Sequence, residues 1–134
     1  MHDIEREVYT TLAKAFREQY PNGSVYDEYV RAPSKFPSVS IVETDNYMKT
    51  AALDTSESER ISTIIYEINV YSAKSTGRKQ ECRDVINLLD GLMYGMNFTR
   101  TAMAPTPNTE DASIYRITAR YRADTDGSYT YRTS

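Results

Sequence analysis

Few residues of this chain are of types that perform acid–base or nucleophilic chemistry. The sequence has one histidine, His2, and one cysteine, Cys82. A serine or cysteine nucleophile needs a base within hydrogen-bond reach, and His2 lies at a terminus, where chains usually fray. Cys82 belongs to an apolar stripe at helical spacing, which favours a small buried hydrophobe over a reactive thiol. We therefore predict no catalytic residue and a protein that is not an enzyme.

Motifs for metals and phosphates are equally sparse. A structural zinc site needs about four nitrogen or sulfur ligands. The run Asp124-Thr125-Asp126-Gly127 has the spacing that begins a calcium-binding loop, but the glutamate expected at the twelfth position would fall after Ser134. The run from Ser75 to Lys79 has one glycine and lacks the spacing of a phosphate-binding loop. We predict no metal site and no cofactor.

A row of arginines is the charged pattern that stands out. Side chains alternate between the two faces of a strand, so in the segment 114–123 Arg116, Arg120 and Arg122 share one face. These arginines either decorate a solvent-exposed surface, or they pair with carboxylates of a neighbouring subunit or line a channel that nucleic acid passes through. We name them as candidates for a subunit interface or a lumen.

An acidic segment supplies a complement to this row. It runs from Asp45 to Arg60 and its apolar residues have no steady period, which indicates a long loop or an extended hairpin tip. Head-to-tail rings need two different complementary patches on each copy. The candidates for contacting a neighbouring copy are Asp45, Asp54, Glu57 and Glu59.

The hydrophobic periodicity predicts the elements that hold these residues. Apolar residues recur at spacings of three and four in 4–20 and 77–94, which predicts two amphipathic helices. Alternation and turn signals predict strands in 24–30, 38–43, 64–71, 97–103 and 114–123. We predict an α+β single domain in residues 1–124, with order α-β-β-β-α-β-β, and a flexible tail in 125–134. The sheet would be mainly antiparallel, with four to five strands and both helices on one face.

Composition limits the class of protein further. The sequence has no apolar run long enough for a membrane span, and its single cysteine predicts a cytosolic origin. A net charge of −3 argues against a domain devoted to neutralising nucleic-acid phosphate. The chain has 12 tyrosines and no tryptophan; tyrosine suits interfaces, although β-propensity alone also explains it.

A resemblance to a known family rests on the order of these elements and on three stretches. They are Ile64 to Ser72, the helix with Cys82 to Asp90, and the pair Gly95 to Phe98 with Ile114 to Tyr121. Together with the first helix and the proline-bracketed strand before Ile41, these segments make the chain similar to the tail terminator (tail completion) family of long-tailed bacteriophages. The resemblance covers nearly the whole chain but includes no catalytic signature.

The resemblance implies an α+β subunit of a hexameric ring in the virion neck, assembled in the host cytoplasm. Such a ring caps the tail tube, terminates tail polymerisation and presents a surface to the head. The resemblance implies that the segment from Asp45 to Arg60 reaches toward the tube or a neighbouring copy. The partners it implies are other copies of the chain, the tail tube protein and a head-completion or connector protein, with DNA passing through the lumen without specific binding. The alternatives are a head-completion or adaptor protein of the same neck and a small nucleic-acid-binding module.

Overall fold

The described residues form two helices packed on one twisted sheet. The computed structural model describes residues 4–28, 33, 35–48, 62–106, 113–125 and 130–131. The helices are α1 (Ile4–Gln19) and α2 (Arg78–Gly95). The strands are β1 (Ser24–Tyr26), β2 (Ser38–Met48), β3 (Ser62–Ser72), β4 (Thr99–Pro105), β5 (Tyr115–Thr125) and β6 (Thr130–Tyr131).

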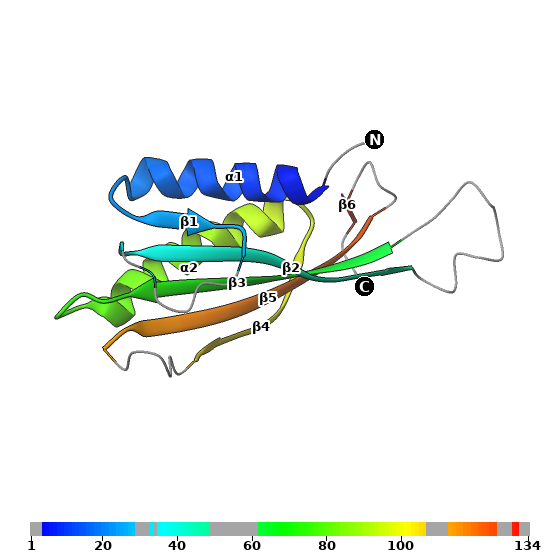
Figure 1. Cartoon of the computed structure of the whole chain (residues 1–134). Helices are drawn as coiled ribbons and strands as arrows, with labels where there is room; N and C mark the ends of the chain where they lie inside the picture. Colours follow the sequence, from blue (N-terminus) through cyan, green and yellow to red (C-terminus); the bar gives the residue numbers. More distant parts are fainter. Residues whose placement is uncertain are drawn as a thin grey trace, which may run out of the picture.

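The sheet has the strand order β1-β2-β3-β5-β4, and the short strand β6 pairs with the end of β5 (Figure 1). Among the described strand pairs, β1 and β2 are parallel and the others are antiparallel. Because β3 already pairs with β5 up to Thr125, β6 lies on the other edge of β5 and continues the line of β4. The predicted α+β class and the predicted order of helices and strands are confirmed.

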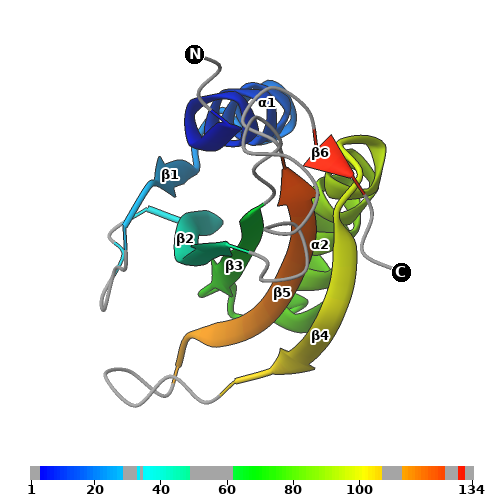
Figure 2. The same cartoon turned by 90° about the vertical axis from the view of Figure 1, so that its right-hand side faces the viewer.

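Both helices cover the same face of the sheet, and they also contact each other (Figure 2). The apolar stripes predicted from the 3.6-residue period lie in this core, where removal of apolar surface from water stabilises the fold. The helices contribute Val8, Leu12, Phe16, Cys82, Val85, Ile86, Leu89 and Met93. Alternate strand residues complete the core: Val39, Ile41, Ile64, Tyr66, Ile68, Val70, Ile117, Ala119, Tyr121 and Ala123.

A close approach at Gly23 joins α1 to the sheet. A Cβ at this position would lie 2.4 Å from the carbonyl oxygen of Pro37 and 2.8 Å from the ring of Phe16. The next residue, Ser24, donates its backbone N–H to the same Pro37 carbonyl over 3.1 Å. A side chain at position 23 would therefore separate β1 from the start of β2.

The ends of α2 use backbone conformation for their caps. Gly77 adopts φ of 79° before the first turn, and no side chain caps this end of the helix with a hydrogen bond. After the helix, Asn97 adopts φ of 70°, and the N–H groups of Met96 and Phe98 bond to carbonyls of the last turn. The left-handed Asn97 thus follows the end of α2 at Gly95, one residue past the predicted limit at 94.

The acidic segment begins inside the sheet. β2 was predicted to end at residue 43, but it continues to Met48, and β3 begins at Ser62. The alternation breaks because a register shift between Glu43 and Asp45 inserts an extra residue, as in a β-bulge. Both strands extend past the end of α1, as Figure 1 shows.

The C-terminal end of the sheet also lies beyond the predicted domain boundary at 124. Thr125 is the last residue of β5 and is buried, and Thr130 and Tyr131 of the predicted tail pair with β5. The other residues of the predicted tail lie outside the described part of the chain.

Candidate interaction face

The face of the sheet opposite the helices carries the predicted arginines. Arg116, Arg120 and Arg122 project from β5 together with Thr118, beside their register partners Tyr71, Glu67, Ile65 and Asn69 on β3. We call these eight residues the arginine face. Neither of the two described helices covers it.

Asn69 is the centre of a hydrogen-bond network on this face. Its carbonyl oxygen accepts bonds from Arg116 Nε over 2.9 Å and from Thr118 Oγ1 over 2.7 Å. Its amide nitrogen donates to Glu67 Oε2 over 3.3 Å and to Ser40 Oγ over 3.4 Å. The side chain is fully buried, and all four of its bonding positions are used. Asn69 therefore joins β2, β3 and β5 through side chains.

A single ion pair holds Arg120 on the same face. Arg120 Nε and Nη2 both lie 3.2 Å from Glu67 Oε1. The glutamate side chain is 8% exposed, whereas the arginine side chain is 61% exposed. A buried carboxylate needs compensating donors, so Arg120 serves the fold of its own chain. Solvent around the exposed arginine keeps the contribution of the pair to stability small.

Arg116 is engaged a second time, by an aromatic ring. Its guanidinium carbon lies 5.5 Å from the centroid of the Tyr71 ring, within the range of a cation–π contact. Burial raises the pKa of the Tyr71 hydroxyl, while the Arg116 charge and a hydrogen bond with Ser40 act in the opposite direction. Tyr71 is thus neutral near pH 7 and packs as an amphipathic ring.

Arg122 differs from the other two arginines. Its side chain is half-buried, and its Nε atom is shielded from solvent without a hydrogen-bond acceptor in the described part of the chain. In register it lies between Ile65 of β3 and Thr99 of β4. Of the three arginines, Arg122 is therefore the one whose Nε is buried without an acceptor among the described residues.

The acidic candidates are only partly placed. Asp45 is paired with Ile65, which is itself paired with Arg122, so Asp45 and Arg122 lie in one register row two strands apart. The side chain of Asp45, and the residues Asp54, Glu57 and Glu59, lie outside the described residues. The structure therefore brings the three arginines together on one face and places the backbone of Asp45 in the register row of Arg122.

A second polar cluster, which the sequence did not predict, lies at the end of α2. The Tyr121 hydroxyl donates to Asp90 Oδ1 over 2.8 Å, and Arg100 Nη1 lies 3.5 Å from the same oxygen. With Tyr94 and Phe98 these residues line a hollow of about 280 Å³. Burial raises the pKa of Tyr121, and the bond to Asp90 and its charge raise it further. The Tyr121 hydroxyl therefore stays protonated and donates to the Asp90 carboxylate of α2. Arg100 pairs with the same carboxylate and offsets its charge.

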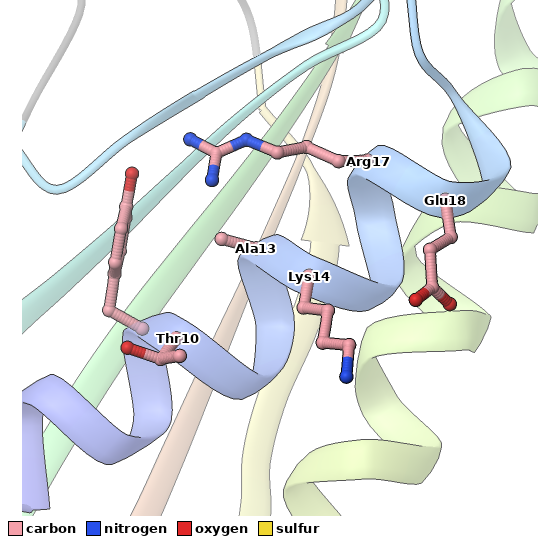
Figure 3. A pocket seen from close by; sticks show the side chains of 6 residues that line it. Thr10, Ala13, Lys14, Arg17 and Glu18 are labelled. Carbon is pink, nitrogen blue, oxygen red and sulfur yellow. The ribbon is translucent and has the colours of Figure 1, made fainter.

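A hollow of about 400 Å³ lies on α1. Figure 3 shows that its charged side chains, Lys14, Arg17 and Glu18, extend in different directions from the helix. Their signs are mixed, so this surface does not concentrate one charge.

Cys82 is packed as its apolar stripe predicted. It is buried, and its thiol lies 3.7 Å from the Val70 carbonyl oxygen and 3.5 Å from that of Tyr115. Burial, and secondarily the charge of Glu81, raises the pKa of the thiol to about 12. The thiolate is the reactive form of cysteine, so Cys82 is inert at neutral pH. Within the described ranges no three side chains of the metal-ligating types gather into a possible site.

Comparison with known proteins gives no assignment: no protein-family model matches the chain, and no curated protein matches it. Neither described helix is long and apolar enough to cross a membrane.

Proposed function

We propose that this chain is a structural subunit of the neck of a long-tailed bacteriophage. Copies of the chain form a ring that caps the tail tube, stops tail polymerisation and provides the surface that joins the head. The ring assembles in the host cytoplasm and remains in the virion. The resemblance of the sequence to tail terminators supports this proposal, and the α+β order of elements agrees with what that resemblance implies.

The arginine face is the observation that carries the proposal. Apart from Arg122, its polar side chains are fixed by a network around Asn69, and the face lies on the side of the sheet away from both described helices. Arginine and tyrosine are enriched at the centres of protein interfaces. A surface that is ordered in advance loses less entropy when it binds. These properties favour protein contact over a merely solvated sheet face.

The β2–β3 hairpin supplies the second patch that a ring requires. Contacts that close a ring are heterologous, so each copy must present two different complementary surfaces. β2 and β3 extend past α1 and lead into the acidic segment that includes Asp54, Glu57 and Glu59. In our proposal this segment contacts the tube or the next copy, and the arginine face receives a neighbour.

The alternative within the neck is a head-completion or adaptor protein, which differs from a tail terminator in its partner. The tests are binding to the tail tube protein and binding to the portal complex. A nucleic-acid-binding module is less favoured, because the carboxylate of Glu67 lies among the arginines and would repel phosphate. That alternative requires binding to DNA that weakens steeply with salt.

Native mass measurement of the chain, alone and with tail tube protein, tests the proposal. We expect a closed ring, six copies if the resemblance holds, at least in the presence of the tube. A chain that stays monomeric with the tube and binds only the portal complex would contradict tail termination and favour the adaptor. Turnover of a substrate that one substitution abolishes would contradict a structural role altogether.

Deletion of residues 50–57 tests the acidic segment. We expect the shortened chain to fold with an unchanged melting temperature, because the removed residues lie between the described ends of β2 and β3. If the segment engages the tube, phage assembly with this variant should yield tails longer than normal. A variant with Asp54, Glu57 and Glu59 replaced by asparagine or glutamine removes their charges but keeps the length of the segment, so it separates the effect of charge from that of length. Normal tail lengths from the folded deletion variant would exclude this role.

A further inference from the structure

The three arginines of the arginine face are not equivalent. Arg116 is bonded to Asn69 and lies over Tyr71, and Arg120 is paired with Glu67. Both guanidinium groups have acceptors within their own chain. Arg122 has a buried Nε without an acceptor in the described part of the molecule, and its nearest register neighbours on both sides are Ile65 and Thr99.

An arginine in this situation is costly to the isolated chain. Guanidinium is a permanent cation with five N–H donors, and a shielded donor without an acceptor loses its bonds to water and gains none in exchange. Buried polar atoms of this kind are rare in folded proteins, and each calls for an explanation such as an absent partner. A methionine of similar length would fill the same space without this penalty.

We propose that Arg122 receives a carboxylate from a second copy of the chain, whereas Arg116 and Arg120 are held for the fold of their own copy. This inference rests on the proposed ring and names the arginine that makes the contact between subunits. The carboxylate binds the half-buried guanidinium side-on, with one oxygen accepting from Nε and the other from a terminal nitrogen, because this edge is a planar fork that matches a carboxylate.

Charge favours a protein acceptor over phosphate. The chain has 19 acidic residues against 16 basic ones, so each copy offers carboxylates in excess. Glu67 lies two strand positions from the residue opposite Arg122, and its carboxylate lowers the positive potential that a nucleic-acid backbone would require. A strand of phosphates lying along this face would be repelled by the Glu67 carboxylate. A single carboxylate from a neighbouring copy can approach Arg122 without lying against Glu67.

Parallel substitutions of the three arginines test the inference. We expect Arg122→Met to leave the melting temperature of the monomer unchanged or raised, and to weaken ring formation by about tenfold to about a hundredfold in sedimentation. Ring formation by Arg122→Lys should be weaker than that of the wild type and stronger than that of Arg122→Met, because lysine keeps the charge but lacks the planar fork of guanidinium. Arg116→Met and Arg120→Met should lower the melting temperature, while the folded fraction assembles with nearly normal affinity.

The outcomes separate this inference from the proposed function. If the Arg122→Met variant forms rings as readily as the wild type does, the proposed role of Arg122 is wrong, while the proposed ring stands. A wild-type chain that does not assemble, alone or on tube protein, would overturn the proposed function and with it the acceptor on a second copy. If the wild type binds a DNA duplex in a salt-dependent way, and Arg122→Met loses this binding but assembles normally, then Arg122 binds phosphate and not a carboxylate of a second copy.

Discussion

The two faces of the sheet are built by different physical rules. The helix-covered face is filled by apolar side chains such as Ile68 and Val70, which belong to one core cluster with apolar residues of α1 and α2. The arginine face is organised by hydrogen bonds that converge on Asn69, and its charged groups stand at defined distances from their partners. The first face explains why the chain folds, and the second provides a surface that another molecule can recognise. Substitutions on each face should therefore fail in different ways.

Truncation of the apolar face is expected to have the largest effect. Leu89 is a fully buried residue of α2, so Leu89→Ala should lower the free energy of unfolding by about 3 kcal/mol through lost burial and the cavity left behind. Leu88→Ala, at a half-buried position next to it, is the control and should cost about 1 kcal/mol. Urea unfolding measures both. Equal effects of the two substitutions would show that the helix does not pack as described.

Removal of the centre of the polar face should be the next most damaging change. Asn69→Ala deletes the bonds to Arg116, Thr118 and Glu67 and leaves buried polar groups without partners, which should cost about 2 kcal/mol. The exposed asparagine of α2, Asn87, provides the matched control, and Asn87→Ala should be nearly neutral. A neutral Asn69→Ala would mean that the polar face is solvated and not built around this residue.

Alkaline pH should reveal a smaller difference between the faces. The pKa of Cys82 is raised from 9.0 to about 12 in the folded chain. Its contribution to stability is therefore complete below about pH 9 and is lost as the pH rises toward 12, because only the unfolded chain ionises the thiol in that window. Cys82→Ala should flatten the alkaline decline in the free energy of unfolding.

The arginine face contributes to the same window through Tyr71, whose pKa is also raised. The Arg116 charge opposes that shift, so Tyr71→Phe should flatten the decline less than Cys82→Ala does. Urea titrations between pH 8 and about 11 measure both slopes. A larger change from Tyr71→Phe would reverse the ranking of the two faces.

The apolar face was largely predictable from the sequence, and the polar network was not. Periods of 3.6 and 2 placed Leu89, Ile68 and Ile117 in the core, because burial depends on local patterning. The same alternation placed the arginines of β5 on one face. Asn69 and Thr118, by contrast, are 49 residues apart, and no periodicity reports which long-range partners share a hydrogen bond.

Two local features also escaped the pattern. The irregularity near Thr44 breaks the alternation of β2, so the strand was predicted to stop at residue 43 although it continues to Met48. Tyr121 followed the alternation of β5 onto the apolar face, but its bond to Asp90 depends on how α2 crosses the sheet. The sequence did not predict this contact, because the packing of α2 on the sheet determines it and spacing along the chain does not.

The strand order has a consequence for motion within the molecule. β3 and β5 are paired along their full lengths and lie between other strands, with β2 outside one and with β4 and β6 outside the other. Their amide protons can exchange with solvent only after flanking strands have opened, so they belong to the most slowly exchanging unit of the chain. Because β5 also carries the three arginines, their backbone lies in one of the most rigid segments of the molecule. Local opening of the edge strands would not displace it.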